Sequence, residues 1–259
     1  MKRALALIGP PLALGLILVL GWAALCEILS LPTWLLPSPL AVLAALIDRA
    51  PILLPSALTT VWMALQALAL AGLVGGGLAV LLSFSRLAER AFRPVAIAIQ
   101  VTPVVAVAPL IQIWVGLDRA DLAVILLAAC VAFFPLFSGV LTGLRSADPD
   151  LERLFDLYGA SPLQRLIRLR LPSALPYVLE ALRVAAGLSV IGAVVAEFVA
   201  GSGAAQGLAW RILEAGNRLR TAEMIAALAW LTALGLLLNG LIALIRRVLM
   251  TRRGGQPQR

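Results

Sequence analysis

The side chains that most often perform acid–base, metal or phosphate chemistry are nearly missing from this sequence. It contains no histidine, and its single lysine is Lys2, so it offers neither the commonest general base nor a G-x-x-x-x-G-K-[ST] phosphate loop. Cys26 and Cys130 lie in separate apolar runs and form no C-x-x-C motif. We therefore expect no catalytic residue, no metal site and no cofactor, and any ATP that is used would bind to another subunit.

One segment, residues 159–172, combines its residue types in a pattern that suits docking. Ser161 can accept hydrogen bonds from first-turn amides, Gln164 follows three residues later as in a capping box, and Pro162 fills the first helical position. Pro172 is predicted to end this helix. One side is predicted to be apolar and the rest basic, with Leu163, Leu166, Ile167 and Leu171 facing away from Arg165, Arg168 and Arg170.

The predicted helix is short. About eight to ten residues at 1.5 Å each give roughly 12–15 Å, which is too little to cross a bilayer. Two interpretations fit this length, a docking device for a partner protein and an amphipathic loop helix that rests on the lipid surface.

The rest of the chain has the composition of a polytopic membrane protein. Its 259 residues are 62% hydrophobic, with a mean hydropathy of +1.01, against an apolar share of ~45–50% in ordinary soluble domains. Six runs contain about 20 predominantly apolar residues, and they cover 9–29, 57–83, 94–116, 121–144, 174–200 and 223–246. We predict an all-α fold with six transmembrane helices and a short helix outside the membrane.

Basic residues are distributed unevenly between the two sides of the predicted membrane. If the N-terminus is inside, fifteen of the 21 lysines and arginines are cytoplasmic, and Arg183 lies within a run. The five on the outside are Arg49, Arg119, Arg211, Arg218 and Arg220. The positive-inside rule then puts both termini and residues 159–172 in the cytoplasm, and it explains the net charge of +8 without a nucleic-acid partner.

The docking segment resembles the cytoplasmic coupling motif of permease subunits of ABC importers, E-A-A-x-x-x-G, nine residues, then I-x-L-P. Gly159 matches the glycine, and Leu169, Leu171 and Pro172 match the end of the motif. Residues 153–155 replace E-A-A, and Glu152 stands one residue early. The resemblance implies that the ATPase is contacted by Gly159, Ala160, Ser161, Pro162, Leu163, Leu166, Ile167, Leu169, Leu171 and Pro172.

Two further stretches narrow the resemblance to the nitrate, sulfonate and taurine permeases. Residues 101–116 are similar to their P-x-x-A-x-x-P-L-x-x-x-W-x-G stretch, and residues 194–198 to V-V-A-E-[MF]. The resemblance implies a type I importer permease in the bacterial inner membrane. It also implies a non-catalytic homodimer, two ABC ATPase subunits, and a periplasmic solute-binding protein that delivers a small solute.

Several functions remain open at this stage. The resemblance implies nitrate, an alkanesulfonate or taurine as the substrate, and related permeases for a pyrimidine or vitamin precursor or an aromatic acid are the alternative. An ion-coupled secondary transporter and a non-transporting membrane assembly subunit belong to other classes. The first of these often shows repeated halves, and no repeat is visible here.

Polar residues at membrane depth are the candidates for the translocation pathway. The third run holds Gln100, Thr102, Pro103, Pro109 and Gln112, and the fifth holds Glu197. Polar groups and proline breaks are tolerated there where they line a cavity or are buried, so a pathway competes with a plain kink or packing. Glu180 and Arg183, one helical turn apart, are predicted to neutralise each other.

The predicted domains follow from these assignments. Residues 1–56 form the first transmembrane helix and an outer interfacial segment with Trp34 as an anchor, and 57–250 form the permease core with five transmembrane helices. Residues 251–259 are predicted to be a disordered cytoplasmic tail.

Overall fold

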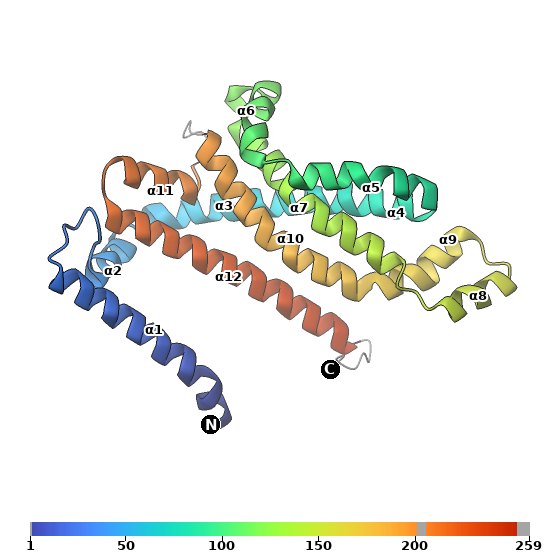
Figure 1. Cartoon of the computed structure of the whole chain (residues 1–259), viewed down its shortest axis with the longest axis horizontal. Helices are drawn as coiled ribbons and strands as arrows, with labels where there is room; N and C mark the ends of the chain where they lie inside the picture. The colour runs from blue at the N-terminus through green and yellow to red at the C-terminus, as the bar shows by residue number, and fades with distance from the viewer. Residues whose placement is uncertain (1, 201–205, 253–259) are drawn as a thin grey trace.

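In the computed structural model of the chain, residues 2–200 and 206–252 are described, and every regular element among them is helical (Figure 1). The predicted tail therefore lies mostly outside the described residues. The longer elements are α1 (Lys2–Ile28), α2 (Pro39–Asp48), α3 (Ala50–Ala71), α4 (Gly77–Ser83), α5 (Arg86–Val101), α6 (Val104–Val115), α7 (Ala120–Leu144), α8 (Pro149–Leu157), α10 (Leu171–Ala200), α11 (Leu208–Asn217) and α12 (Thr221–Arg252). The shorter ones are η1 (Gly72–Gly76), η2 (Leu117–Arg119), α9 (Pro162–Arg165) and η3 (Leu166–Arg170).

Four helical stretches in the described chain are long and apolar enough to span a membrane, or five if the bent pair α5–α6 counts as one span. The four are Ala50–Ser83, Ala120–Leu144, Pro162–Val199 and Thr221–Thr251. The predicted first span is represented by a shorter apolar stretch of α1, Ala13–Ile28. The all-α, multi-span prediction is confirmed, and the number six is not reached by length and hydropathy alone.

The predicted third span, 94–116, is wrong as one straight helix. Helices α5 and α6 meet at an angle of 96°, with the break at Thr102 and Pro103. Both residues have extended backbones, with ψ of 122° and 117°. A residue before proline is pushed out of the helical region and proline itself donates no hydrogen bond, so the helix ends here.

Helix α7 is the centre of the bundle and contacts α3, α4, α5, α6 and α10 (Figure 1). Small residues bring α7 and α10 close together. A Cβ atom added to Gly143 would lie 3.0 Å from the Cα atom of Ala174, and one added to Gly192 would lie 2.8 Å from that of Ala128. Such close backbone approach is how membrane helices associate without a hydrophobic driving force.

Charged residues on α10 bind to α12 and not to each other, so the predicted Glu180–Arg183 pair is wrong. The carboxylate of Glu180 lies 2.8 Å from the guanidinium of Arg246, and Arg183 Nε donates a 3.0 Å hydrogen bond to Asn239 Oδ1. Arg246 and Asn239 are therefore the partners in place of the pair within α10. Both contacts join α10 to α12, which pack against each other.

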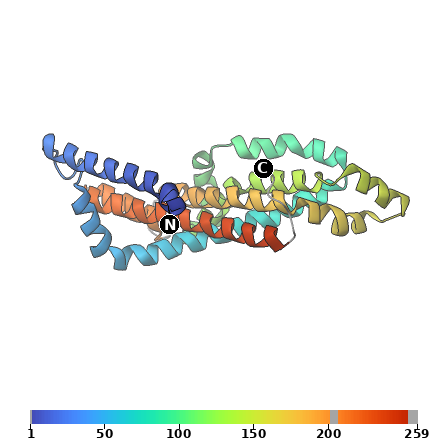
Figure 2. The same ribbon diagram turned by 90° about the horizontal axis from the view of Figure 1, so that it is seen from below.

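The bundle has two distinct ends (Figures 1 and 2). Helices α2 and α11 and the starts of α3 and α12 gather at one end, and α8 and α9 project from the opposite end. The projecting hairpin contains the segment singled out as a docking device.

Candidate functional site

The docking segment is the second half of a helical hairpin whose first half, α8, the sequence reasoning missed. Asp148 caps α8, since its Oδ1 accepts a 2.8 Å hydrogen bond from the amide of Asp150, and Pro149 occupies the first position. Glu152 adds a second acid to the first turn. This start signal is present in the sequence and could have revealed the helix.

Gly159 turns the chain between the two halves of the hairpin. Its φ of +62° lies in the left-handed region, which glycine adopts without a Cβ penalty. The amide of Ala160 donates to the carbonyl of Phe155, and the amide of Gly159 to that of Asp156, both at 3.0 Å. These two bonds form a Schellman motif that ends α8.

Ser161 starts the second half with the predicted capping box. Its Oγ accepts a 3.3 Å hydrogen bond from the amide of Gln164, and its own amide donates a 2.9 Å bond to Gln164 Oε1. Pro162 stands at the first helical position. The start of the helix is therefore confirmed in each of its three parts.

Pro172 does not end the helix, and this prediction is wrong. Residues Pro162–Val199 form one continuous helical stretch of 38 residues, in which η3 is a π-helical turn. The amide of Leu171 bonds to the carbonyl of Leu166, five residues back. The wider turn relieves the clash that the ring of Pro172 would make with the preceding turn of an α-helix.

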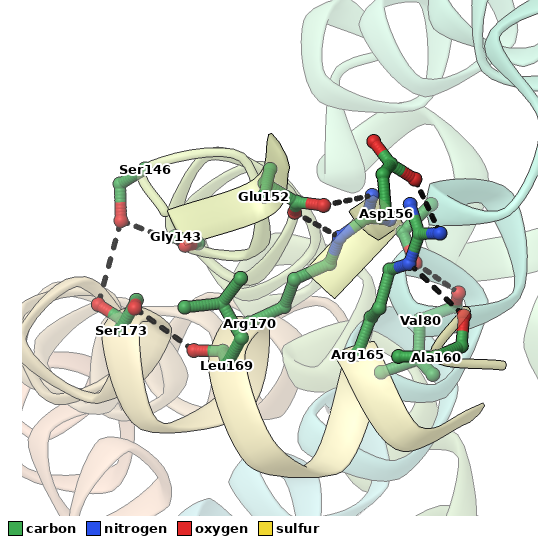
Figure 3. Close-up of polar contacts among 11 residues, drawn as sticks. Val80, Gly143, Ser146, Glu152, Asp156, Ala160, Arg165, Leu169, Arg170 and Ser173 are labelled. Atoms are coloured by element: carbon green, nitrogen blue, oxygen red, sulfur yellow. Dashed lines mark hydrogen bonds and ion pairs between the residues drawn. The ribbon is translucent and has the colours of Figure 1, made fainter. Parts of the chain in front are cut away.

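Two ion pairs hold the halves of the hairpin together (Figure 3). Arg170 binds both carboxylate oxygens of Glu152, with Nε at 2.7 Å and a terminal nitrogen at 3.3 Å. Arg165 pairs with Asp156 and donates a 3.3 Å bond to the carbonyl of Ala160. Glu152 is the acid nearest to the position of the glutamate in the family motif. Through Arg170 it joins α8 to the docking segment.

The apolar side chains of the segment divide between two faces, so the prediction that they share one side is wrong in part. Leu166 and Leu169 are buried, and Leu166 packs into the cluster of α7 that contains Leu144. Leu163, Ile167 and Leu171 are exposed, the first two at 60% and 56%. Leu157 and Tyr158, beside the turn, are exposed at 85% and 83%, and we call these five exposed side chains of the hairpin the tip surface.

The base of the hairpin is tied to the end of α7. Ser146 Oγ donates to the carbonyl of Gly143 at 2.8 Å and lies 3.4 Å from that of Ser173. Arg145 pairs with the buried carboxylate of Glu89 on α5. Burial, and then the nearby arginines Arg86 of α5 and Arg170 of η3, lower the pKa of Arg145.

Three of the five polar candidates of the third run lie at the α5–α6 break, and two lie further along α6. Gln100, Thr102 and Pro103 are exposed there, and Thr102 Oγ1 donates a 2.7 Å bond to the carbonyl of Ala98. Pro109 is exposed within α6, and Gln112 is half-buried with no hydrogen-bond partner for its Nε2 atom in the described part of the chain.

Glu197 is separate from these residues and binds the start of α11. Its Oε2 accepts hydrogen bonds from the amides of Ala209 at 3.0 Å and Trp210 at 3.2 Å. Thr60 on α3 donates to its Oε1 at 3.3 Å and accepts a 2.9 Å bond from the amide of Leu208. Glu197, exposed by only 2%, therefore caps one helix from another.

A cavity of ≈ 800 Å³ opens beside α5 and α7, near the hairpin end of the bundle. Its wall combines charged, hydroxyl and aromatic side chains, including those of Glu89, Arg93, Phe137, Thr142, Arg145 and Tyr177. The sequence reasoning did not identify this cavity, since its lining comes from three helices far apart in the chain.

Together these features define a bundle of long apolar helices that carries an ion-paired helical hairpin at one end. Residues 70–254 match the family described as "Binding-protein-dependent transport system inner membrane component". The chain belongs to this family, the membrane permease subunits of ABC importers, in which the ATPase activity resides in a separate subunit. Such permeases are multi-pass inner-membrane proteins that work with ATPase and substrate-binding partners.

Curated relatives of the chain are named as permeases for different solutes. A probable ABC transporter permease protein of Haemophilus influenzae is 34% identical, covering 90% of this chain and 92% of the relative. The formylaminopyrimidine transport permease protein ThiX of Halalkalibacterium halodurans is 32% identical over 99% of this chain and 100% of its own length. A putative aliphatic sulfonates transport permease protein SsuC of Bacillus subtilis is 30% identical over 71% and 67%.

Proposed function

We propose that the chain forms the translocation pathway of an ABC importer as a homodimer, and that residues 159–172 couple it to the ATPase. One observation carries this proposal. The tip surface of the hairpin exposes large apolar side chains at the far end of a rigid, ion-paired support. Exposed apolar patches that are held in this way are typical of protein interfaces. A loop helix that rested on lipid would not need the braces to α8.

The coupling step follows from the continuity of the helix. Because the helical stretch Pro162–Val199 continues from the docking segment into α10, a displacement of the tip surface by the ATPase would be passed directly to α10. Closure of the ATPases on ATP would thereby exchange an inward-facing for an outward-facing pathway.

The pathway is proposed to run beside α5, α6 and α7. The cavity of ≈ 800 Å³ and the exposed polar residues at the α5–α6 break support this assignment, because irregular backbone at membrane depth is stable only where it lines water or protein. We assign Gln100, Thr102, Pro103, Pro109 and Gln112 to the pathway beyond this cavity, whose own lining does not include them. Glu197 contributes by positioning α11 at the outer end.

The proposal also includes six transmembrane spans and both termini in the cytoplasm. The domain boundaries follow residues 56 and 250. The separation of charges supports the orientation. Arg145, Arg165 and Arg170 lie at the hairpin end, where the positive-inside rule expects the cytoplasm. We include α1 as the sixth span, since its full length of 27 residues is sufficient to cross.

The substrate is proposed to be a small solute of the kinds named for the relatives. Nitrate, an alkanesulfonate or taurine is the first candidate, from the stretches at residues 101–116 and 194–198. A pyrimidine precursor is the second, favoured because the formylaminopyrimidine relative matches nearly the whole chain.

The proposal is tested by replacing Ile167 on the tip surface with aspartate. The permease is co-expressed with its candidate ABC ATPase and solute-binding protein, and the complex is purified and assayed for ATP-driven uptake in proteoliposomes. Ile167→Asp should insert normally but lose the ATPase. Leu249→Asp, at the end of α12 and 39% exposed, is the matched control and should keep it. Equal retention of the ATPase by both variants would refute the coupling assignment.

A further inference from the structure

Four of the five arginines on the proposed outer side meet in one pocket. Its volume is ≈ 200 Å³, and it lies between the start of α3, helix α11 and the start of α12. The charged side chains that line it are Arg49, Arg211, Glu214, Arg218, Arg220 and Glu223. Because arginine outside the membrane works against the positive-inside bias, their concentration in a single place calls for a function.

The arginines of this outer arginine pocket exceed the carboxylates available to them. Glu214 is shared by Arg211 at 3.0 Å and Arg218 at 3.1 Å. Glu223 is shared by Arg49 at 2.7 Å and Arg220 at 3.6 Å. Four guanidinium groups therefore face two carboxylates, which leaves two positive charges and several N–H donors for a further anion.

The inner wall of the pocket is fixed to the transport helices. Arg211 Nε donates a 3.0 Å hydrogen bond to Ser56 on α3, and the start of α11 is capped by Glu197 on α10. A group that binds in the pocket would thus pull on α3 and α10 through short, buried contacts.

The rim of the pocket is accessible. The side chains of Arg218 and Arg220 are exposed by 56% and 46%. Between them Leu219 adopts a φ of +55°, in the left-handed region that residues with a Cβ atom rarely occupy. This turn puts Arg218 and Arg220 at the mouth of the pocket. A partner can contact them there before it reaches Arg49 and Arg211.

We propose that the outer arginine pocket binds an aspartate or glutamate side chain of the solute-binding protein. That the partner is a solute-binding protein rests on the proposed function. The excess of arginines in the pocket indicates that the partner contributes a carboxylate from an acidic surface. A transported anion is the weaker match, because no residue of α5, α6 or α7 lines the pocket and an ion held there would be off the pathway. Arginine forks bind carboxylates in pairs of hydrogen bonds, and exposed charges speed association.

The test uses the permease with its ATPase in nanodiscs and the binding protein that copurifies with them. Binding is measured by biolayer interferometry at several salt concentrations. Reversal of both rim charges, Arg218→Glu with Arg220→Glu, should weaken binding about tenfold or more and flatten its salt dependence. Arg119→Glu is the matched control, an exposed outer arginine that does not line the pocket, and should stay within about twofold of the parent.

Each of the other possible results would overturn one part of the proposal: the docking site, the proposed function or the kind of ligand. If the double variant and Arg119→Glu bind the solute-binding protein equally well, the pocket is not the docking site, although the solute-binding protein remains the partner. If the unaltered permease recruits no binding protein, the proposed function fails first. If methanesulfonate, at constant ionic strength, binds the unaltered permease alone and not the double variant, the pocket serves a free anion. Should the reversal prevent assembly, Arg218→Gln with Arg220→Gln removes the charges without adding acids beside Glu214 and Glu223, and the same comparison applies.

Discussion

Replacing Gly159 with valine should disconnect the permease from its ATPase without preventing membrane insertion. Nothing lies within 4 Å of a Cβ atom added to this glycine, so the cost of a side chain is conformational and not steric. At φ +62° a residue with a Cβ atom loses about 1–2 kcal/mol, and the branched side chain of valine is among the least tolerant.

This cost is comparable with what holds the hairpin in place. The capping box of Ser161 contributes on the order of 1 kcal/mol. The ion pairs Glu152–Arg170 and Asp156–Arg165 are partly exposed and contribute roughly 0–1 kcal/mol each. A loss of about 2 kcal/mol changes the ratio of ordered to disordered hairpin by a factor of roughly 30, which is enough to empty much of the ordered state.

The assay compares three substitutions at Gly159 for uptake per ATP hydrolysed in proteoliposomes. Asparagine tolerates the left-handed region and should stay near the parent, alanine should be intermediate, and valine should be lowest. Equal amounts of each variant in the membrane fraction exclude a defect of insertion. If valine and asparagine support the same coupled uptake, the turn is not part of the coupling device.

Three further predictions follow from other contacts. In a background without native cysteines, Ser161→Cys should be protected from an impermeant thiol reagent in spheroplasts and Arg119→Cys should label; the opposite pattern reverses the topology. Glu197→Ala should raise the rate of hydrogen exchange at the first amides of α11 about tenfold or more, because hydrogen bonds to a charged group, of about 1.5–3 kcal/mol, are lost. Glu197→Gln should raise the rate less. An unchanged rate would show that Glu197 does not cap α11. Glu152→Arg and Arg170→Glu should each reduce coupled uptake, and the combination should restore part of it; an additive loss would show that the pair does not act as a unit.

Local signals in the sequence predicted local structure well. Ser161, Pro162 and Gln164 define a helix start through contacts within four residues, and Gly159 defines the turn before it. These features need no tertiary partner, so the chain alone specifies them. The start of α8 at Asp148 carries an equally local signal.

Contacts between distant residues could not be predicted in this way. Arg170 has arginine neighbours in sequence but pairs with Glu152, eighteen positions earlier. Glu180 has Arg183 one turn away but pairs with Arg246 on another helix. Which partner is chosen depends on how the helices pack, and the spacing along one helix does not contain that information.

The prolines show the same limit most clearly. Pro103 breaks a helix and Pro172 does not, although both follow helical sequence. At the first, Thr102 is extended and its hydroxyl bonds to the carbonyl of Ala98, which helps to end α5. At the second, Leu166, Leu169 and Ala174 are buried on either side and hold the stretch in place through a π turn.

This difference bears on how the proposed transporter moves. Residues Pro162–Val199 are helical without interruption, although α9 and α10 run in different directions (Figure 1), so the docking segment lies at one end of this stretch and Glu197 near the other. A push at Ile167 would be passed to α10, and through Glu197 to α11 and the outer arginine pocket. The break at Thr102 and Pro103 is the hinge-like point in the apolar elements around α7. Opening and closing should therefore occur by movement of α5 and α6 against a core of α7 and α10.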